Sequence, residues 1–259
     1  LVAGLLGFLQ TGLVFGDLIG RILSAGGCIG RALKSDRAAF RQMSWSGIKY
    51  VAARFSDFPK YTLPSQLLNT VSVALPILLL GAYYSKEEVG YFSMAMTLLA
   101  LPVNVISFSL RDVFRQKANE VYVATGNCRT LFLRMLRTVT LGSVAVGFVV
   151  VWFLPLLFAV VLGHEWRMSG VYSQIMLPMM VFDFVAMSVS GVMIITEKVR
   201  QLLWWQIYML SVTVIALVGS YYLFNDILIS LIALSVGKMS AYALYVKLNY
   251  KYSKGNTEE

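Results

Sequence analysis

Four ionisable side chains lie inside stretches of the sequence that are otherwise apolar. Asp17 and Arg21 fall in the first such stretch, Asp183 in a later one and Lys238 in the last. A charged side chain at the centre of a lipid bilayer costs on the order of 3 kcal/mol. Each of these residues therefore needs a partner or a charged ligand, and we expect them to bind charge.

Lys238 lies past the midpoint of the last apolar stretch, just after residues 232–236. Its ammonium group is suited to attract an anionic ligand; the alternative is a lysine that extends to the lipid headgroups. Asp183 stands between Phe182 and Phe184, far from any basic residue in the sequence. We expect this lone carboxylate either to carry a coupling proton or cation, or to hydrogen-bond to a neighbouring helix.

Asp17 and Arg21 are four residues apart, so they share one face of a helix. Either Arg21 offers its charge to an anionic ligand, or the two residues form a structural ion pair near the membrane surface. Neutral amides form a second set of candidates, because they can hydrogen-bond to a polar ligand or hold two helices together. They are Gln66, Asn69, Asn104 and Gln174.

The elements that must position these residues are membrane-spanning helices. About 20 apolar residues are needed for a helix to cross the hydrocarbon core. Seven stretches meet this length, so we predict an all-α, polytopic transmembrane helix bundle. They are Leu1 to Ser24, Pro64 to Tyr84, Val89 to Leu110, Thr138 to Leu162, Val171 to Ile195, Leu202 to Phe224 and Ile227 to Val246.

Basic residues are concentrated in alternate connections between these stretches. Residues 31–60 and 111–137 are rich in Lys and Arg, whereas residues 83–88, 164–170 and 225–226 hold two such residues in all. The positive-inside rule therefore places the basic connections and the carboxyl terminus in the cytoplasm. All connections agree with this single orientation.

Composition excludes several function classes. Hydrophobic residues make up 58% of the chain and the mean hydropathy is +0.71, well above the values of a soluble domain. The net charge of +9 lies mostly in the cytoplasmic connections, where membrane topology and anionic lipids account for it, so nucleic acid is not an expected partner. His164 is the only histidine and the outer connections are short, which argues against a membrane enzyme.

Cys28 and Cys128, the two cysteines, are both expected near the cytoplasmic face, where thiols stay reduced. The sequence therefore predicts neither a disulfide nor a metal or cofactor site. Because the chain opens at Leu1 inside an apolar helix, we expect it to be part of a longer protein.

Two connections show helical patterns of their own. Apolar residues recur at helical spacing between the first and second spans, which predicts an amphipathic helix on the membrane surface. These residues are Leu33, Phe40, Met43, Ile48, Val51 and Phe55. After the third span the pattern runs from Arg111 to Thr125 without a breaker, and Gly126-Asn127 supplies a turn. We therefore expect the third and fourth spans to extend into the cytoplasm as a helical hairpin.

A series of short runs between Phe58 and Glu120 resembles the polysaccharide-exporter branch of the MATE-like flippases, which includes the Wzx O-antigen flippases. The runs are Phe58-Pro59-Lys60-Tyr61, Leu63-Pro64-Ser65, Leu67-Leu68-Asn69, Leu75-Pro76-Ile77-Leu78-Leu79-Leu80, Val89-Gly90-Tyr91-Phe92 and Leu101-Pro102. The resemblance is strong in this region and looser beyond it. Members of the family have two six-helix lobes that face each other across a central cavity.

The resemblance implies that residues 1–28 are the last helix of a first lobe, that residues 29–61 form a basic amphipathic linker, and that residues 62–248 form the six-helix second lobe, followed by a cytoplasmic tail at 249–259. It also implies that an undecaprenyl-diphosphate-linked oligosaccharide moves across the bacterial inner membrane for O-antigen, lipopolysaccharide or capsule assembly. The expected partners are that substrate, membrane lipids and other polysaccharide assembly proteins.

The candidate pathway residues are then Lys238, Arg21, Asp17, Asp183, Asn69 and Gln66. With such a substrate, Lys238 would attract the diphosphate or the carboxylate of a sugar acid, Arg21 would share its charge with a substrate phosphate, and the amides would hydrogen-bond to sugar hydroxyls. Rocking of two lobes around a wet, partly cationic cavity would expose the site to each side of the membrane in turn. Two alternatives stay open at this point: a cation-coupled drug exporter of the MATE type, and an inactive truncated remnant.

Overall fold

The computed structural model describes residue 16 and residues 19–27, 30, 44–55 and 58–255. The chain divides into two compact units, Leu1–Ser56 and Asp57–Glu259. In the first unit, residues 19–27 are helical and helix α4 spans Trp45–Arg54. Helix α4 forms part of the predicted surface helix, of which Leu33, Phe40 and Met43 lie outside the described residues, as does most of the first predicted span.

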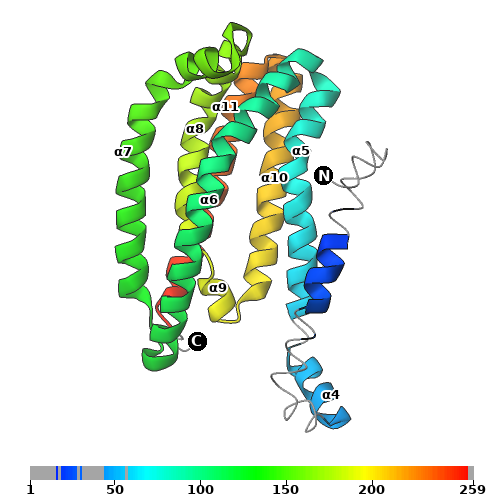
Figure 1. Ribbon diagram of the computed structural model, residues 1–259, viewed down its shortest axis with the longest axis vertical. Helices are drawn as coiled ribbons and strands as arrows, with labels where there is room; N and C mark the ends of the chain where they lie inside the picture. The colour runs from blue at the N-terminus through cyan, green and yellow to red at the C-terminus, as the bar shows by residue number, and fades with distance from the viewer. Residues whose placement is uncertain (1–15, 17–18, 28–29, 31–43, 56–57, 256–259) are drawn as a thin grey trace. The chain divides into compact units, whose positions relative to one another are not determined.

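The second unit is built from helices alone in the part that the structure describes (Figure 1). Six of its helical segments are long and apolar enough to cross a membrane. This confirms the predicted all-α polytopic bundle. In chain order the helices are η1 (Phe58–Thr62), α5 (Leu63–Tyr83), α6 (Lys86–Thr125), α7 (Arg129–Leu162), η2 (His164–Trp166), α8 (Arg167–Ser188), α9 (Val192–Ile195), α10 (Val199–Phe224) and α11 (Ile227–Ser253).

Local sequence sets where these helices begin and end. Ser85 and Glu88 form a reciprocal capping box at the start of α6. Gly126 adopts a left-handed conformation, with φ of 69°, and stops α6 at Thr125. The predicted hairpin is thereby confirmed as two helices that continue beyond the apolar stretches. Hydropathy alone ended the third span too early, at Leu110, and began the fourth too late, at Thr138, because it does not register the polar turns that prolong a helix outside the bilayer.

Helix α8 lies at the centre of the packing. It contacts α6, α7 and α11 along much of its length, and α10 packs between α11 and α5. Helices α5 and α6 contact each other much less, and so do α6 and α7. The core between these helices includes Phe92, Met176 and Leu231, each at most 1% exposed.

The connections α5–α6, α7–α8 and α10–α11 lie at one end of this unit (Figure 1). The α6–α7 turn, α9 and the carboxyl-terminal end of α11 lie at the other end. Connections that are poor in Lys and Arg and connections that are rich in them alternate in the sequence, and they therefore lie at opposite ends of the bundle. We refer to the end with the α6–α7 turn as the basic end.

Candidate functional site

Lys238 is buried within the membrane-spanning part of α11, with only 7% of its surface exposed. The buried residues of α11 recur at intervals of three and four along one face, and they include Leu234, Lys238, Ala241 and Tyr245. This face packs against α8 and α10. The lysine is therefore part of the packed face of α11, and Val236, 60% exposed, marks a different face.

Asp183 projects from α8 as a half-buried side chain and interacts electrostatically with Lys238. The Tyr242 hydroxyl, one turn further along α11, donates a hydrogen bond to the Asp183 carboxylate. Asp183 is thus not the isolated carboxylate that its sequence neighbours indicated. The packing of α8 on α11 supplies both of its partners.

This cluster of Asp183, Lys238 and Tyr242 compensates its own charge. A buried ion whose counter-charge is removed is strongly destabilising, whereas a paired one is tolerated. In the described part of the chain, buried side-chain oxygens or nitrogens that lack a partner occur only at Thr62, Ser169, Ser173 and Asn249. None of these orphaned atoms belongs to the charge cluster. The two opposite charges of Asp183 and Lys238 interact with each other inside the membrane-spanning part of the bundle.

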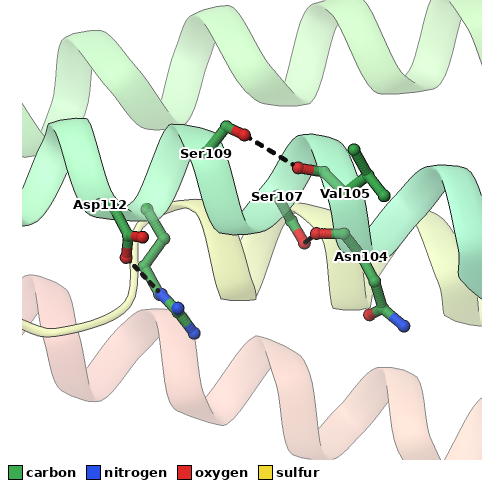
Figure 2. Close-up of polar contacts among 6 residues, drawn as sticks. Asn104, Val105, Ser107, Ser109 and Asp112 are labelled. Atoms are coloured by element: carbon green, nitrogen blue, oxygen red, sulfur yellow. Dashed lines mark hydrogen bonds and ion pairs between the residues drawn. The ribbon is translucent and has the colours of Figure 1, made fainter. Parts of the chain in front are cut away.

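A second cation, Arg111, lies toward the basic end on α6. Its guanidinium Nε donates to Asp112 at 3.2 Å, marked by the dashed line beside Asp112 in Figure 2, and its charged end lies 4.7 Å from the centre of the Phe108 ring. Arg111 also acts electrostatically on Tyr245 of α11. In the sequence, Arg111 is part of a basic connection that indicates membrane topology. Its spacing of seven residues from Asn104 also places both residues on one face of a helix.

Asn104 is exposed on α6, and its backbone carbonyl accepts a hydrogen bond from Ser107 at 3.3 Å. In Figure 2 the Asn104 side chain points away from the side of α6 on which α7 runs, and Ser109 points toward that side. The amide of Asn104 is therefore available on the face of α6 that does not meet α7.

Gln66 and Asn69 are both exposed on α5. The opposite face of this helix is buried, and there Gln206 of α10 donates to the Ser72 hydroxyl at 3.3 Å. Of the polar residues on α5, Ser72 thus holds helices together, whereas the two amides face outward from this unit. Within the described residues, no hydrogen bond joins Gln66 or Asn69 side chains to the Asp183 cluster.

Arg21 lies in the helical stretch 19–27 of the first unit and is exposed. Asp17, its predicted partner, lies outside the described residues. Among the residues that the structure describes, no group of three or more His, Cys, Asp or Glu side chains is arranged to hold a metal ion. Gln174 donates to the Val151 carbonyl at 2.8 Å, so this amide joins α8 to α7.

Comparison with known families gives one match. A family described as "Polysaccharide biosynthesis protein" matches residues 2–171, about two thirds of the chain. The match includes Gln66, Asn69 and Arg111 and ends before Asp183 and Lys238. No curated protein and no solved structure matches the chain.

Proposed function

The chain belongs to the polysaccharide biosynthesis protein family, and we propose that its part in this process is to carry a lipid-linked oligosaccharide across a membrane. The cargo we propose is an undecaprenyl-diphosphate-linked repeat unit, as handled by the Wzx branch, and the membrane is the bacterial inner membrane. The product would enter O-antigen, lipopolysaccharide or capsule assembly.

The observation that carries this proposal is the charge cluster of Asp183, Lys238 and Tyr242 between two membrane-spanning helices. A diphosphate with several sugars cannot enter hydrocarbon without losing its hydration, at a cost of several kcal/mol for each exposed polar group. Burial of an ionisable residue inside a membrane helix is costly. Such residues are therefore rare, and they mark the paths of ions and polar substrates. Lys238 supplies the positive charge that a diphosphate needs.

In the proposed mechanism, the substrate diphosphate competes with Asp183 for the Lys238 ammonium. When Lys238 turns to the phosphate, Asp183 keeps the hydrogen bond from Tyr242 but loses its counter-charge. A coupling cation or proton would then restore neutrality at Asp183. This exchange links substrate binding to the driving ion without any covalent step, so the protein would act as a transporter and not as an enzyme.

Arg111 and Asn104 extend the proposed pathway toward the basic end. Asn104 lies on the face of α6 that does not meet α7, and Arg111, seven residues further along α6, shares that face. The Arg111 guanidinium, which interacts with Tyr245 of α11, can donate hydrogen bonds to phosphate oxygens. The exposed amide of Asn104 can hydrogen-bond to sugar hydroxyls. Arg21, Gln66 and Asn69 remain predicted contributors, each exposed in its own unit.

An exporter of organic cations is the main alternative, and the pairing of Asp183 weighs against it. Such an exporter needs a carboxylate that is open to a cationic drug. Here the carboxylate already has a cationic neighbour, Lys238. A like charge from the drug would meet the ammonium group at low effective dielectric, where repulsion is strong.

The test is complementation of a bacterial strain that lacks its own O-antigen flippase, with the gene that encodes this chain. Two pools are measured: polymer on the cell surface, and lipid-linked repeat units on the inner leaflet. Restored polymer together with a cleared inner pool is expected. A persistent inner pool, with the protein inserted and a compatible repeat unit present, would contradict the proposal.

A further inference from the structure

A hollow of about 610 Å³ lies between α6 and α7, with α8 as its floor. Its lining is almost wholly apolar, with Val103 and Ile106 from α6, Val139 and Val146 from α7, and Val181 from α8. All three helices are membrane-spanning, so the hollow lies at the depth of the hydrocarbon core. It is separate from the charge cluster, none of whose residues lines it.

The geometry of α7 explains why the space stays open. Near one end, Gly170 of α8 lies so close to the Pro155 backbone that a Cβ atom would not fit, so the two helices are in direct contact there. Near the basic end, the rings of Phe114 and Phe132 meet edge to face with centroids 6.2 Å apart. Between these contacts α6 and α7 both rest on α8 and scarcely touch each other.

The hollow extends over about one leaflet of a bilayer along α6 and somewhat further along α7. Its lining runs from Leu99 to Leu110 on α6 and from Met135 to Val150 on α7, which is about 16 Å and about 22 Å at about 1.5 Å per residue. Half of the hydrocarbon core is about 15 Å. A single acyl chain fits this length, whereas a long polyprenyl chain would extend well beyond it.

The mouth of the hollow at the basic end carries positive charge. Met135 and Thr138 line that end, and Arg134 is exposed one turn before Thr138, on the same face of α7. Basic residues next to a membrane attract anionic lipid headgroups. We propose that the hollow binds one acyl chain of an anionic phospholipid from the leaflet at the basic end, with its phosphate at Arg134.

The experiment uses the full chain in nanodiscs that contain a phosphatidylethanolamine and phosphatidylglycerol mixture. A small fraction of the phosphatidylglycerol carries a photoreactive diazirine on one acyl chain, and the labelled peptides are mapped by mass spectrometry. Labelling is expected to concentrate on residues that line the hollow, such as Val103 and Val139. It should exceed labelling at Phe148, which is 70% exposed on α7 but does not line the hollow.

Gly142→Trp fills the hollow, because a Cβ atom at Gly142 meets nothing within 4 Å. The matched control is Ala145→Trp, at an exposed position of the same helix that does not line the hollow. Labelling of the hollow should fall severalfold in the first variant and stay unchanged in the second. Val146→Trp, also in the lining, replaces Gly142→Trp if that variant does not fold.

Arg134→Ala tests the headgroup contact. Its control is Arg129→Ala on the same helix, because the Arg129 guanidinium lies 5.6 Å from the centre of the Tyr250 ring of α11. The first change should weaken the preference for phosphatidylglycerol over phosphatidylcholine probes about fivefold, as expected for loss of one basic residue near the surface. Equal labelling of all lipid-facing helices would overturn the proposal. Displacement of the probe by a polyprenyl phosphate would also overturn it. The same holds if a second copy of the chain, or its first unit, covers the hollow and prevents labelling.

Discussion

Lys238 of α11 and Asp183 of α8 interact electrostatically where two membrane-spanning helices pack together. Neither residue has an opposite charge close to it in the sequence. The pair exists only because α8 and α11 lie side by side. It follows that the two side chains should depend on each other both for stability and for transport.

Removal of one member of this pair should destabilise the protein more than removal of both. Lys238→Met or Asp183→Asn alone leaves an uncompensated group in the bundle, and a loss of about 3 kcal/mol is expected for a broken buried pair. The double variant should recover a large part of that loss. Unfolding in detergent, analysed as a double-mutant cycle, measures the coupling. Additive losses would show that the two charges act independently.

Tyr242→Phe should weaken the cluster without changing its charge. The hydroxyl that donates to Asp183 is lost, and a cost of about 1 kcal/mol is expected for one hydrogen bond between membrane helices. Tyr208→Phe is the control, because its hydroxyl bonds to Ser240 at 3.2 Å at an exposed site. Thermal unfolding of both variants gives the comparison. An equal effect of the two changes would mean that Tyr242 does not support Asp183.

The basic end of the bundle should face the cytoplasm. Lys86→Cys lies at the start of α6, at the opposite end, and Lys254→Cys follows the end of α11 at the basic end. In spheroplasts, a maleimide that cannot cross membranes should label the first variant directly and the second only after permeabilisation, both in a background without the native cysteines. The reverse pattern would invert the topology and the direction of transport.

Cys128 should react slowly with thiol reagents. It is 1% exposed, and burial raises the pKa of its thiol above the ordinary value. A raised pKa leaves less of the reactive thiolate at pH 7.5, so maleimide labelling should be about tenfold slower or more in the folded protein than after denaturation. The Cys28→Ser variant isolates this thiol, and labelling should accelerate as the pH rises. Rapid labelling at neutral pH would indicate that the Phe114–Phe132 packing around Cys128 opens.

The membrane-spanning helices were predictable because each one is specified by its own residues. A run such as Thr138 to Leu162 is long and apolar enough to predict a membrane span, whatever residues it packs against. The continuation of α6 to Thr125 was also predictable, since Gly126 supplies a left-handed helix end. Such features depend on local sequence. In the second unit they reappear as helices with shifted ends, except that the predicted span Val171 to Ile195 is interrupted after Ser188, where Gly191 has a φ of 111° and α9 begins at Val192.

The partnership of Asp183 with Lys238 was not predictable in this way. It depends on which helices pack together, and the low periodicity of apolar helices hides which face is buried. One signal was present: Lys238 and Tyr242 are four residues apart, so an ionisable and a hydroxyl-bearing side chain share one face of α11. The proposed contribution of Arg111 to the pathway was not predictable for another reason. Its position at the end of an apolar stretch indicates membrane topology and gives no sign of a ligand.

The measurement that tests the central claim most directly is export by Lys238 variants in the flippase-deficient strain. Lys238→Met removes the charge that the proposed diphosphate needs, and Lys251→Met removes an exposed charge near the end of the same helix. We predict that Lys238→Met, inserted at normal levels, loses surface polymer and accumulates lipid-linked repeat units on the inner leaflet, while Lys251→Met and Lys238→Arg retain export. Normal surface polymer from Lys238→Met would contradict the account.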